Sequence, residues 1–485
     1  MNGGIYRDML GEKQMAFRTT KLSTSLRLGG ACIGLLLSTV PGKAITLQQA
    51  IETAVRENPE VLESISNREG VEFELEQALG LRRPRVDFEA SVGGELRDSP
   101  STRATGRDDN LFLRKQASVV VRQNIYDGGD SQAEIDRQAT RVDAASYRIR
   151  ERSEFIALAV AKEYFEIVRL RKMLGASDGN VAFHQRILGQ ITQVAGDGAL
   201  SISDKQQAKE RIYAAKARAQ ELKLELKEAE ARFIKLVGKP VGSTSEPKNL
   251  GKVIPGSVQS ALKLARSNHP SIRFALADVD TASALVRAAE AKMRPRVALE
   301  GRASVADDIG GVKGFDGDLQ ANVVMNWNLY NGGIDDANIQ EQVRHVDESF
   351  HRMHRISREV EEGVRLSWDR HLQETKRLRE LLRERAAIED LGESYSEQFK
   401  IGERSLLDLL DTQNTKFSVQ LSIATADTAV RFGHYRILAS TGSLLKQLGV
   451  SLSSKSRVYG KKQFDVPEVQ SLDEFNRREP KVGLD

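Results

Sequence analysis

The segment Tyr126-Asp127-Gly128-Gly129 recurs 204 residues later as Tyr330-Asn331-Gly332-Gly333. In both copies, residues that alternate between apolar and polar precede the motif, and a long stretch without proline follows it. The alternation is typical of a strand, and the proline-free stretch is typical of a helix. Two adjacent glycines tolerate positive φ angles, so the chain can turn sharply from strand to helix. We therefore expect strand-to-helix turns at Gly128, Gly129, Gly332 and Gly333.

The repetition extends in both directions from this motif. Arg83-Pro84-Arg85-Val86 recurs as Arg294-Pro295-Arg296-Val297 at an offset of 211 residues, and Ala50-Ile51 recurs as Ala261-Leu262 at the same offset. The second copy has therefore lost seven residues between the two motifs, and this interval should contain a loop because loops tolerate deletions. The sequence predicts a first repeat at 45–238, a linker rich in Pro, Gly and Ser at 239–257, and a second repeat at 258–450.

Each repeat is predicted to contain long helices. No proline occurs between Pro100 and Pro240 or between Pro295 and Pro467, and strong helix formers fill both spans. A single helix over residues 131–194 would be roughly 95 Å long, at about 1.5 Å per residue. A tube or a coiled coil needs such a length, whereas a globular domain rarely does.

Four segments alternate with a period of two, at about 85–95 and 113–124 in the first repeat and about 296–305 and 318–328 in the second. In the last segment Leu319, Val323 and Met325 share one face, and Gln320 and Asn322 share the other. The pattern fits a tilted transmembrane strand with an apolar outside and a polar lumen, and it fits equally a soluble sheet with one wet face. The leader described below and the long helices favour the membrane.

Two hairpins give four strands per chain, which is too few to close a barrel. An open sheet edge cannot lie in lipid, so a membrane barrel would have to be shared between chains. Two copies would give eight strands, whose interior is filled by side chains, whereas three copies would give twelve. We therefore expect a homotrimer surrounded by outer-membrane lipid, because three is the smallest number of copies that leaves a pore.

Residues 1–44 have the layout of a signal peptide. Basic residues precede an apolar core from Leu28 to Val40, and Gly42-Lys43-Ala44 supplies small residues for cleavage; Met15 is an alternative start. The single cysteine, Cys32, lies in this leader, and lipidation there is a weaker alternative because the usual leucine three residues earlier is missing. The net charge of +4 also comes from the leader, so we expect no nucleic-acid partner.

The order, duplication and spacing of these motifs resemble the TolC family of outer-membrane factors, from about Ile45 to Val450. The resemblance implies an α+β membrane protein in which each chain contributes two β-hairpins and long helices. Three chains would form a trimeric 12-stranded β-barrel, continuous with a periplasmic α-helical barrel. The resemblance also implies location in the cell outer membrane with a long periplasmic extension. The implied partners are a periplasmic adaptor (membrane fusion) protein and an inner-membrane ABC transporter or proton-driven pump.

The function that the resemblance implies is a passive exit duct of a tripartite export system, with an iris-like periplasmic gate. The sequence Leu-Tyr-Asn-Gly-Gly at 329–333 is similar to that of the non-lipidated secretion branch, so we expect type I protein secretion ahead of multidrug efflux. A periplasmic coiled-coil scaffold is a further alternative, which would explain the helices but not the two hairpins. No enzyme or cofactor is expected, because His351 and His354 lack the rest of a zinc-binding motif.

The family's gate motif corresponds to residues 402–411, at the tip of the second pair of long helices. Asp408 and Asp411 are three residues apart on one helix face, so three chains would place two rings of carboxylates across the entrance and favour cations. Alternatively, both acids interact with the positive end of the helix that starts near Ser405. By resemblance, the other gate residues are the gating arginine Arg404, the tip acid Asp204 of the first repeat, and Phe399 in place of a tyrosine. The tips expected to dock the adaptor contain Gly198, Ser201, Gly402 and Ser405.

The chain ends in a charged segment, 451–485, with little apolar content. Such a segment buries too little apolar surface to offset the entropy of ordering it. We therefore expect a mobile C-terminal tail.

Overall fold

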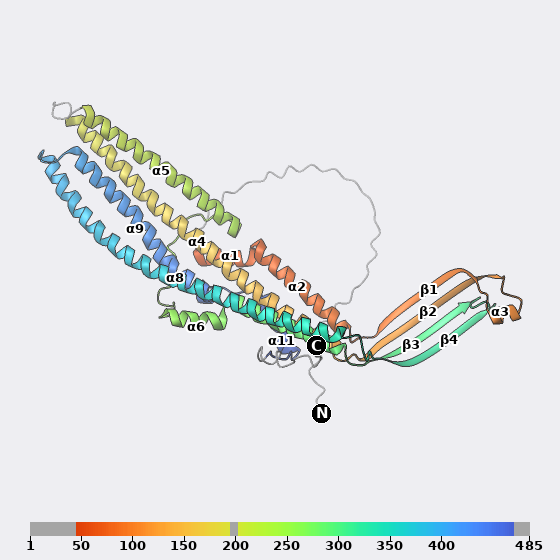
Figure 1. Cartoon of the computed structure of the whole chain (residues 1–485). Coiled ribbons are helices and arrows are strands. Elements are labelled where there is room, and N and C mark those ends of the chain that lie inside the picture. Colours follow the sequence, from red (N-terminus) through yellow and green to blue (C-terminus); the bar gives the residue numbers. More distant parts are fainter. Residues whose placement is uncertain (1–44, 195–201, 470–485) are drawn as a thin grey trace, which may run out of the picture. The chain divides into compact units, whose positions relative to one another are not determined.

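The computed structural model describes residues 45–194 and 202–469 (Figure 1). These ranges contain both predicted repeats, apart from residues 195–201, and the linker at 239–257. The predicted signal peptide at 1–44, the tip residues Gly198 and Ser201, and the end of the predicted tail at 470–485 lie outside the described residues.

The two repeats have the same order of long elements. The first repeat contains α1 (Leu47–Glu57), α2 (Pro59–Gly80), β1 (Arg85–Leu96), α3 (Pro100–Ala104), β2 (Leu111–Tyr126), α4 (Asp130–Val194) and α5 (Ile202–Val237). The second repeat contains α6 (Val258–Asn268), α7 (Pro270–Ala291), β3 (Arg296–Asp307), β4 (Phe315–Asn326), α8 (Ile334–Lys400) and α9 (Leu406–Ser440). The chain continues through α10 (Leu444–Leu448), the 3-10 helix η2 (Ser454–Ser456) and α11 (Gly460–Gln463).

The seven-residue difference between the repeats lies in one loop. Residues 97–110, with the short helix α3, connect β1 to β2, whereas only residues 308–314 connect β3 to β4. The strands on either side keep their offsets of 211 and 204 residues. The deletion predicted between the two motifs is therefore confined to the hairpin loop, where no ladder hydrogen bond depends on it.

Within the described ranges, the strands form one antiparallel sheet in the order β1-β2-β3-β4. The register aligns the apolar positions of neighbouring strands on one face: Phe88 pairs with Val119, Val119 with Ala303, and Ala303 with Leu319. Leu319 is 85% exposed and its neighbour on the same face, Val323, is 74% exposed. One face of the sheet is therefore largely apolar and is left uncovered by the described chain, with an ion pair between Lys115 and Asp307 at 3.3 Å near its loop end.

The opposite face of the sheet carries polar and charged side chains. Arg122 on β2 forms an ion pair with Glu300 on β3 at 3.2 Å.

The last strand ends earlier than predicted. The predicted segment extends over 318–328, whereas β4 ends at Asn326. Trp327 lies outside the ladder, and its indole N–H donates to the carbonyl oxygen of Met293 at 3.1 Å.

The long helices carry the buried core. In the described ranges, no helix is both long enough and apolar enough to cross a lipid bilayer. The core lies where α1, α4, α5 and α9 meet the linker 239–257. Tyr164 and Tyr435 are fully buried there, and their hydroxyls donate to linker carbonyls, Tyr164 to Ser245 at 3.1 Å and Tyr435 to Lys248 at 2.8 Å. The linker is thus a packed cover over the core.

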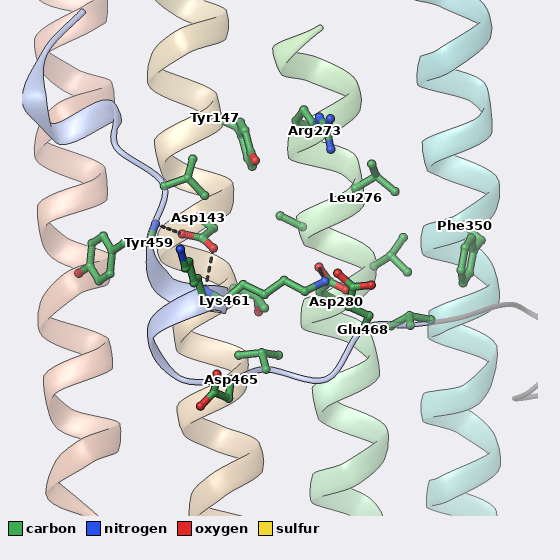
Figure 2. A pocket seen from close by; sticks show the side chains of 17 residues that line it. Asp143, Tyr147, Arg273, Leu276, Asp280, Phe350, Tyr459, Lys461, Asp465 and Glu468 are labelled. Carbon is green, nitrogen blue, oxygen red and sulfur yellow. Dashed lines mark hydrogen bonds and ion pairs between the residues drawn. The ribbon is translucent and has the colours of Figure 1, made fainter. Parts of the chain in front are cut away.

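Four helices lie side by side in the order α2, α4, α7, α8 (Figure 2). Val71 and Leu75 of α2 pack against Ile135 and Ala139 of α4. In the second repeat, residues at the equivalent positions of α7 pack in the same way against α8. The layer therefore contains two equivalent helix pairs, one from each repeat.

The prediction of a mobile tail from residue 451 is wrong for residues 451–469, which we call the C-terminal segment. The Asp143 carboxylate accepts hydrogen bonds from the backbone N–H groups of Tyr459, Gly460 and Lys461 at 2.7–2.8 Å (Figure 2). The segment also borders a cavity of about 730 Å³ against α4, α7 and α8. A few specific contacts to one buried carboxylate thus order a stretch that its composition predicts to be mobile.

Candidate functional site

The strand-to-helix junctions have the backbone geometry that only glycine adopts readily. A Cβ atom at Gly128 would lie 2.6 Å from the carbonyl oxygen of Ala291, so this junction also lacks room for a side chain. The Arg294 guanidinium donates to the Gly128 carbonyl oxygen at 2.9 Å. The φ angles are +73°, +97°, +59° and +80° at Gly128, Gly129, Gly332 and Gly333.

The last residues of α4 and the first residues of α5 lie at the same end of the helices as the turn between α8 and α9 (Figure 1). Ser405 is the N-cap of α9 and its hydroxyl accepts from the Asp408 backbone N–H at 3.2 Å. The Asp408 carboxylate accepts in return from the Ser405 hydroxyl at 2.8 Å. Asp408 therefore has the helix-end contacts of a capping box, which is the alternative that the sequence left open for it.

Asp411 makes a different contact. Its carboxylate pairs with the Arg211 guanidinium of α5 at 3.0 Å, so the ion pair joins the helix pairs of the two repeats. Near this ion pair along α9, the Gln413 amide donates to the Asn180 amide oxygen of α4 at 2.9 Å. These two contacts hold the start of α9 against α4 and α5.

Arg404 contacts only its own helix hairpin among the interactions described for this chain. Its guanidinium donates to the Gln398 amide oxygen at 2.8 Å and lies 4.5 Å from the centre of the Tyr395 ring. Its distance to the Asp408 carboxylate is 4.0 Å, which is the limit for an ion pair. None of these contacts within the described chain reaches α4 or α5.

Phe399 belongs to an apolar cluster that joins α4, α5, α8 and α9 near the tip. The cluster includes Ile187, Ile191, Ala208, Leu406, Leu409 and Leu410. Gly402, which follows α8, has a φ of +82° and so shapes the turn into α9. Asp204 lies in the first turn of α5, where a carboxylate is favoured by the helix dipole.

Two residues in this region, Arg211 and His184, carry no local sequence pattern that would have predicted their place in the site. His184 of α4 is 3% exposed, and its Nδ1 atom has no hydrogen-bond partner among the described residues. Burial lowers the pKa of His184, and the nearby positive charge of Arg211 lowers it further. Both effects favour the neutral ring, and Arg211 is the cation that faces Asp411.

The tip thus combines two carboxylates, Asp408 and Asp411, with contacts between the helix pairs of the two repeats. Within residues 45–194 and 202–469, no cluster of three or more His, Cys, Asp or Glu side chains is arranged to hold a metal ion. The acids at the tip are instead occupied by a helix N-terminus and by an arginine.

Comparison with known sequences identifies the family. The family model for "Outer membrane efflux protein" matches residues 50–239 and 261–443, which are the two repeats without most of the linker. The outer membrane efflux protein BepC of Brucella suis is 23% identical over 396 residues, covering 80% of this chain and 84% of BepC. The outer membrane protein TolC of Escherichia coli is 21% identical over 433 residues, covering 86% of each chain.

Solved structures share the fold at low sequence identity. A structure of CusC, described with the conformational changes of its folding and channel formation, has a TM-score of 0.72 at 14% identity, covering 82% of this chain and 92% of that one. The CmeC outer membrane channel of Campylobacter jejuni has a TM-score of 0.72 at 15% identity, covering 90% of this chain and 98% of that one. The family model and these folds agree, so the chain belongs to the outer membrane efflux protein family, and it is a TolC-like protein of the outer membrane with a periplasmic helical extension.

Proposed function

We propose that the protein is the outer-membrane exit duct of a tripartite export system, a passive conduit built by three copies of the chain. The observation that carries the proposal is the uncovered apolar face of the four-stranded sheet, on which Leu319 and Val323 are 85% and 74% exposed. A sheet face of this kind is stable where lipid covers it.

The two open edges of the sheet, on β1 and β4, support an assembly of several copies. Strands β1 and β4 each have one neighbour within the described chain, so their outer edges leave backbone groups without ladder partners in it. Lipid cannot satisfy those groups, whereas β4 of one copy paired with β1 of the next would. Three copies close twelve strands with a polar interior, where the pair between Arg122 and Glu300 would face water.

The tip would be the periplasmic gate. Asp408 and Asp411 supply carboxylates there, while the Arg211–Asp411 ion pair and the Phe399 cluster hold the two helix pairs together in the closed state. Opening would move the start of α9 away from α5. The turns at Gly402 and Ser405, with Gly198 and Ser201 of the other tip, would form the surface to which a periplasmic adaptor protein docks.

For the cargo, we propose small molecules, exported with an adaptor and an inner-membrane ABC transporter or proton-driven pump. The family's description and the name of BepC favour efflux. Type I protein secretion, which the sequence at 329–333 favours, is the second candidate.

A deletion strain tests the proposed function. Loss of the gene should lower the concentrations at which detergents, dyes and antibiotics inhibit growth, and a plasmid copy should restore them. Unchanged susceptibility together with missing proteins in the culture medium would instead support type I secretion. If the protein were recovered from the soluble periplasm rather than the outer membrane, the duct would be refuted in favour of a scaffold.

A further inference from the structure

We propose that a cavity between α4, α7, α8 and α9 binds a small organic anion, in which an apolar body carries one carboxylate. The carboxylate would pair with Arg436 of α9, which lines the cavity. This site goes beyond the proposed function, because it depends neither on the cargo of the duct nor on the gate or the number of copies.

The cavity lies between the start of α7 and the end of α9. Its volume is about 470 Å³, which is within the size range of sites that bind small molecules. Phe155 and Leu158 of α4 and Pro270 of α7 supply apolar walls. Phe155 is 57% exposed, so one wall of the cavity borders solvent in the described chain.

The equivalent place in the first repeat holds larger side chains. The two repeats align here without a gap, at an offset of 204 residues. Four residues that line the cavity are smaller than their equivalents: Gly363 stands for Ala159, Ser367 for Glu163, Ala439 for Lys235, and Ser440 for Leu236. The smaller side chains of the second repeat leave the space that the cavity occupies.

The same differences leave one arginine without an acid. In the first repeat, Arg232 of α5 pairs with Glu163 of α4 at 2.9 Å. The second repeat keeps the arginine as Arg436, but Ser367 takes the place of the acid. Within the described ranges, Arg436 forms no ion pair or hydrogen bond, and its guanidinium lies 5.0 Å from the centre of the Phe432 ring. A ligand carboxylate would supply the charge that Glu163 supplies to Arg232.

The charges around Arg436 favour an anion. Burial lowers the pKa of Arg436, and the positive charge of Arg370 lowers it further. An arginine stays charged in proteins, so a bound carboxylate would relieve the repulsion between the two guanidinium groups. Two acids also line the cavity, but Glu151 pairs with Arg148 at 3.5 Å. Burial raises the pKa of the other acid, Glu154, to about 7, which removes part of its charge near neutral pH.

His269 adds a neutral donor to the cavity. Its Nδ1 atom accepts from the Ser271 backbone N–H at 3.3 Å, and burial lowers its pKa. A neutral ring with Nδ1 as the acceptor carries its proton on Nε2, which can donate to a ligand. One guanidinium and one neutral N–H group match the two oxygens and the single charge of a carboxylate.

Isothermal titration calorimetry of the full-length protein in mild detergent tests the site. The probe is 2-naphthoate, and its uncharged counterpart is 2-naphthamide. We expect 2-naphthoate to bind saturably, and 2-naphthamide to bind about tenfold more weakly or less, because it cannot form the charged pair.

Two variants test the role of Arg436. Arg436→Gln should weaken the binding of 2-naphthoate by about tenfold to a hundredfold, which is the usual effect of losing hydrogen bonds to a charged group. Ser367→Glu keeps the arginine and restores the acid of the first repeat, so it should abolish binding. If Arg436→Gln does not fold, Ser367→Glu still decides, because it adds a partner for a charge and removes none.

The first repeat offers a matched control. Glu163→Gln/Arg232→Gln removes both charges of the equivalent ion pair and leaves the cavity unchanged. This double variant should bind 2-naphthoate as the parent protein does. Circular dichroism checks that each variant keeps its helices.

Four results would overturn the inference. They are no saturable binding of 2-naphthoate to the parent protein, equal binding of 2-naphthamide, undiminished binding to Ser367→Glu, and binding of inorganic phosphate in preference to 2-naphthoate. None of them bears on the proposed duct, which the deletion strain tests separately.

Discussion

The register of β4 predicts different effects for lysine at two adjacent positions. Val323 pairs with Leu299 on the apolar face, and Asn322 pairs with Glu300 on the polar face. In the proposed barrel, Val323→Lys would place an ammonium group against lipid. Asn322→Lys would place the same group in the water-filled interior, next to an acid.

The magnitude follows from the position of Val323 along the strand. The apolar face extends from Phe315 to Trp327, about 40 Å at roughly 3.4 Å per residue, or about 30 Å of height at a tilt of about 40°. Its midpoint is Ala321, so Val323 lies about 5 Å from the midplane. Lysine at the midplane costs about 2–4 kcal/mol and far less near the interface, so we expect about 2 kcal/mol per chain.

Three copies would multiply this penalty to about 6 kcal/mol for the assembled trimer. The assay compares the yield of each variant in outer-membrane extracts and the temperature at which the detergent-solubilised oligomer dissociates. Val323→Lys should lower both, whereas Asn322→Lys should match the parent protein. Equal behaviour of the two variants, or a stronger effect of Asn322→Lys, would show that the apolar face does not contact lipid.

Three further predictions concern the gate, a buried histidine and the C-terminal segment. Trivalent cations should no longer block purified channels of the Asp408→Asn/Asp411→Asn variant in planar bilayers. They should bind more tightly and block more strongly in Arg211→Gln, because this change frees the Asp411 carboxylate from its ion pair. An unchanged block in the double variant would show that the two acids interact only with the end of their helix. Burial, then the nearby histidine and arginine, lowers the pKa of His434 from 6.5 to about 4, so the folded state favours the neutral ring. The contribution of this ring to stability should be full above pH 6.5 and fall by about 2 kcal/mol between pH 6.5 and 5. The helix melting temperature should therefore fall less over this range in His434→Gln than in the parent protein, and an equal fall in both would contradict the prediction. Gly460→Ala would force a Cβ atom into the Ala139 carbonyl oxygen, so the C-terminal segment should become sensitive to limited proteolysis, whereas Gly256→Ala, with no atom within 4 Å, should not.

The elements common to both repeats could be predicted from the sequence, because a local sequence pattern marks each of them in both copies. The paired glycines, the proline-free spans and the alternating segments each depend on neighbours within a few residues. Comparison of the two copies also located the deletion, which the structure confines to the loop between β1 and β2. Strand ends were predicted less well, as at β4, which ends at Asn326 although the alternation continues to Asn328.

The contacts of the tip could not be predicted, because they join residues far apart in the chain. Arg211 and Asp411 are 200 residues apart, and neither carries a local pattern that indicates its partner. The prediction for the C-terminal segment was wrong for a related reason. Its composition predicts mobility, but one buried carboxylate, Asp143, satisfies three of its backbone donors.

The two hairpin loops of each chain differ in length, so the outer rim of the proposed trimer would expose two kinds of loop. In the proposed trimer each chain would contribute two similar hairpins to the barrel wall. The wall would therefore have approximate six-fold symmetry, whereas the assembly as a whole has three-fold symmetry. The loop at 97–110, with α3, is longer than the loop at 308–314, so tall and short loops alternate around the outer rim. A bacteriophage or an antibody that recognises the tall loop would therefore find one site per chain, and the rim could change in evolution without disturbing the wall beneath it.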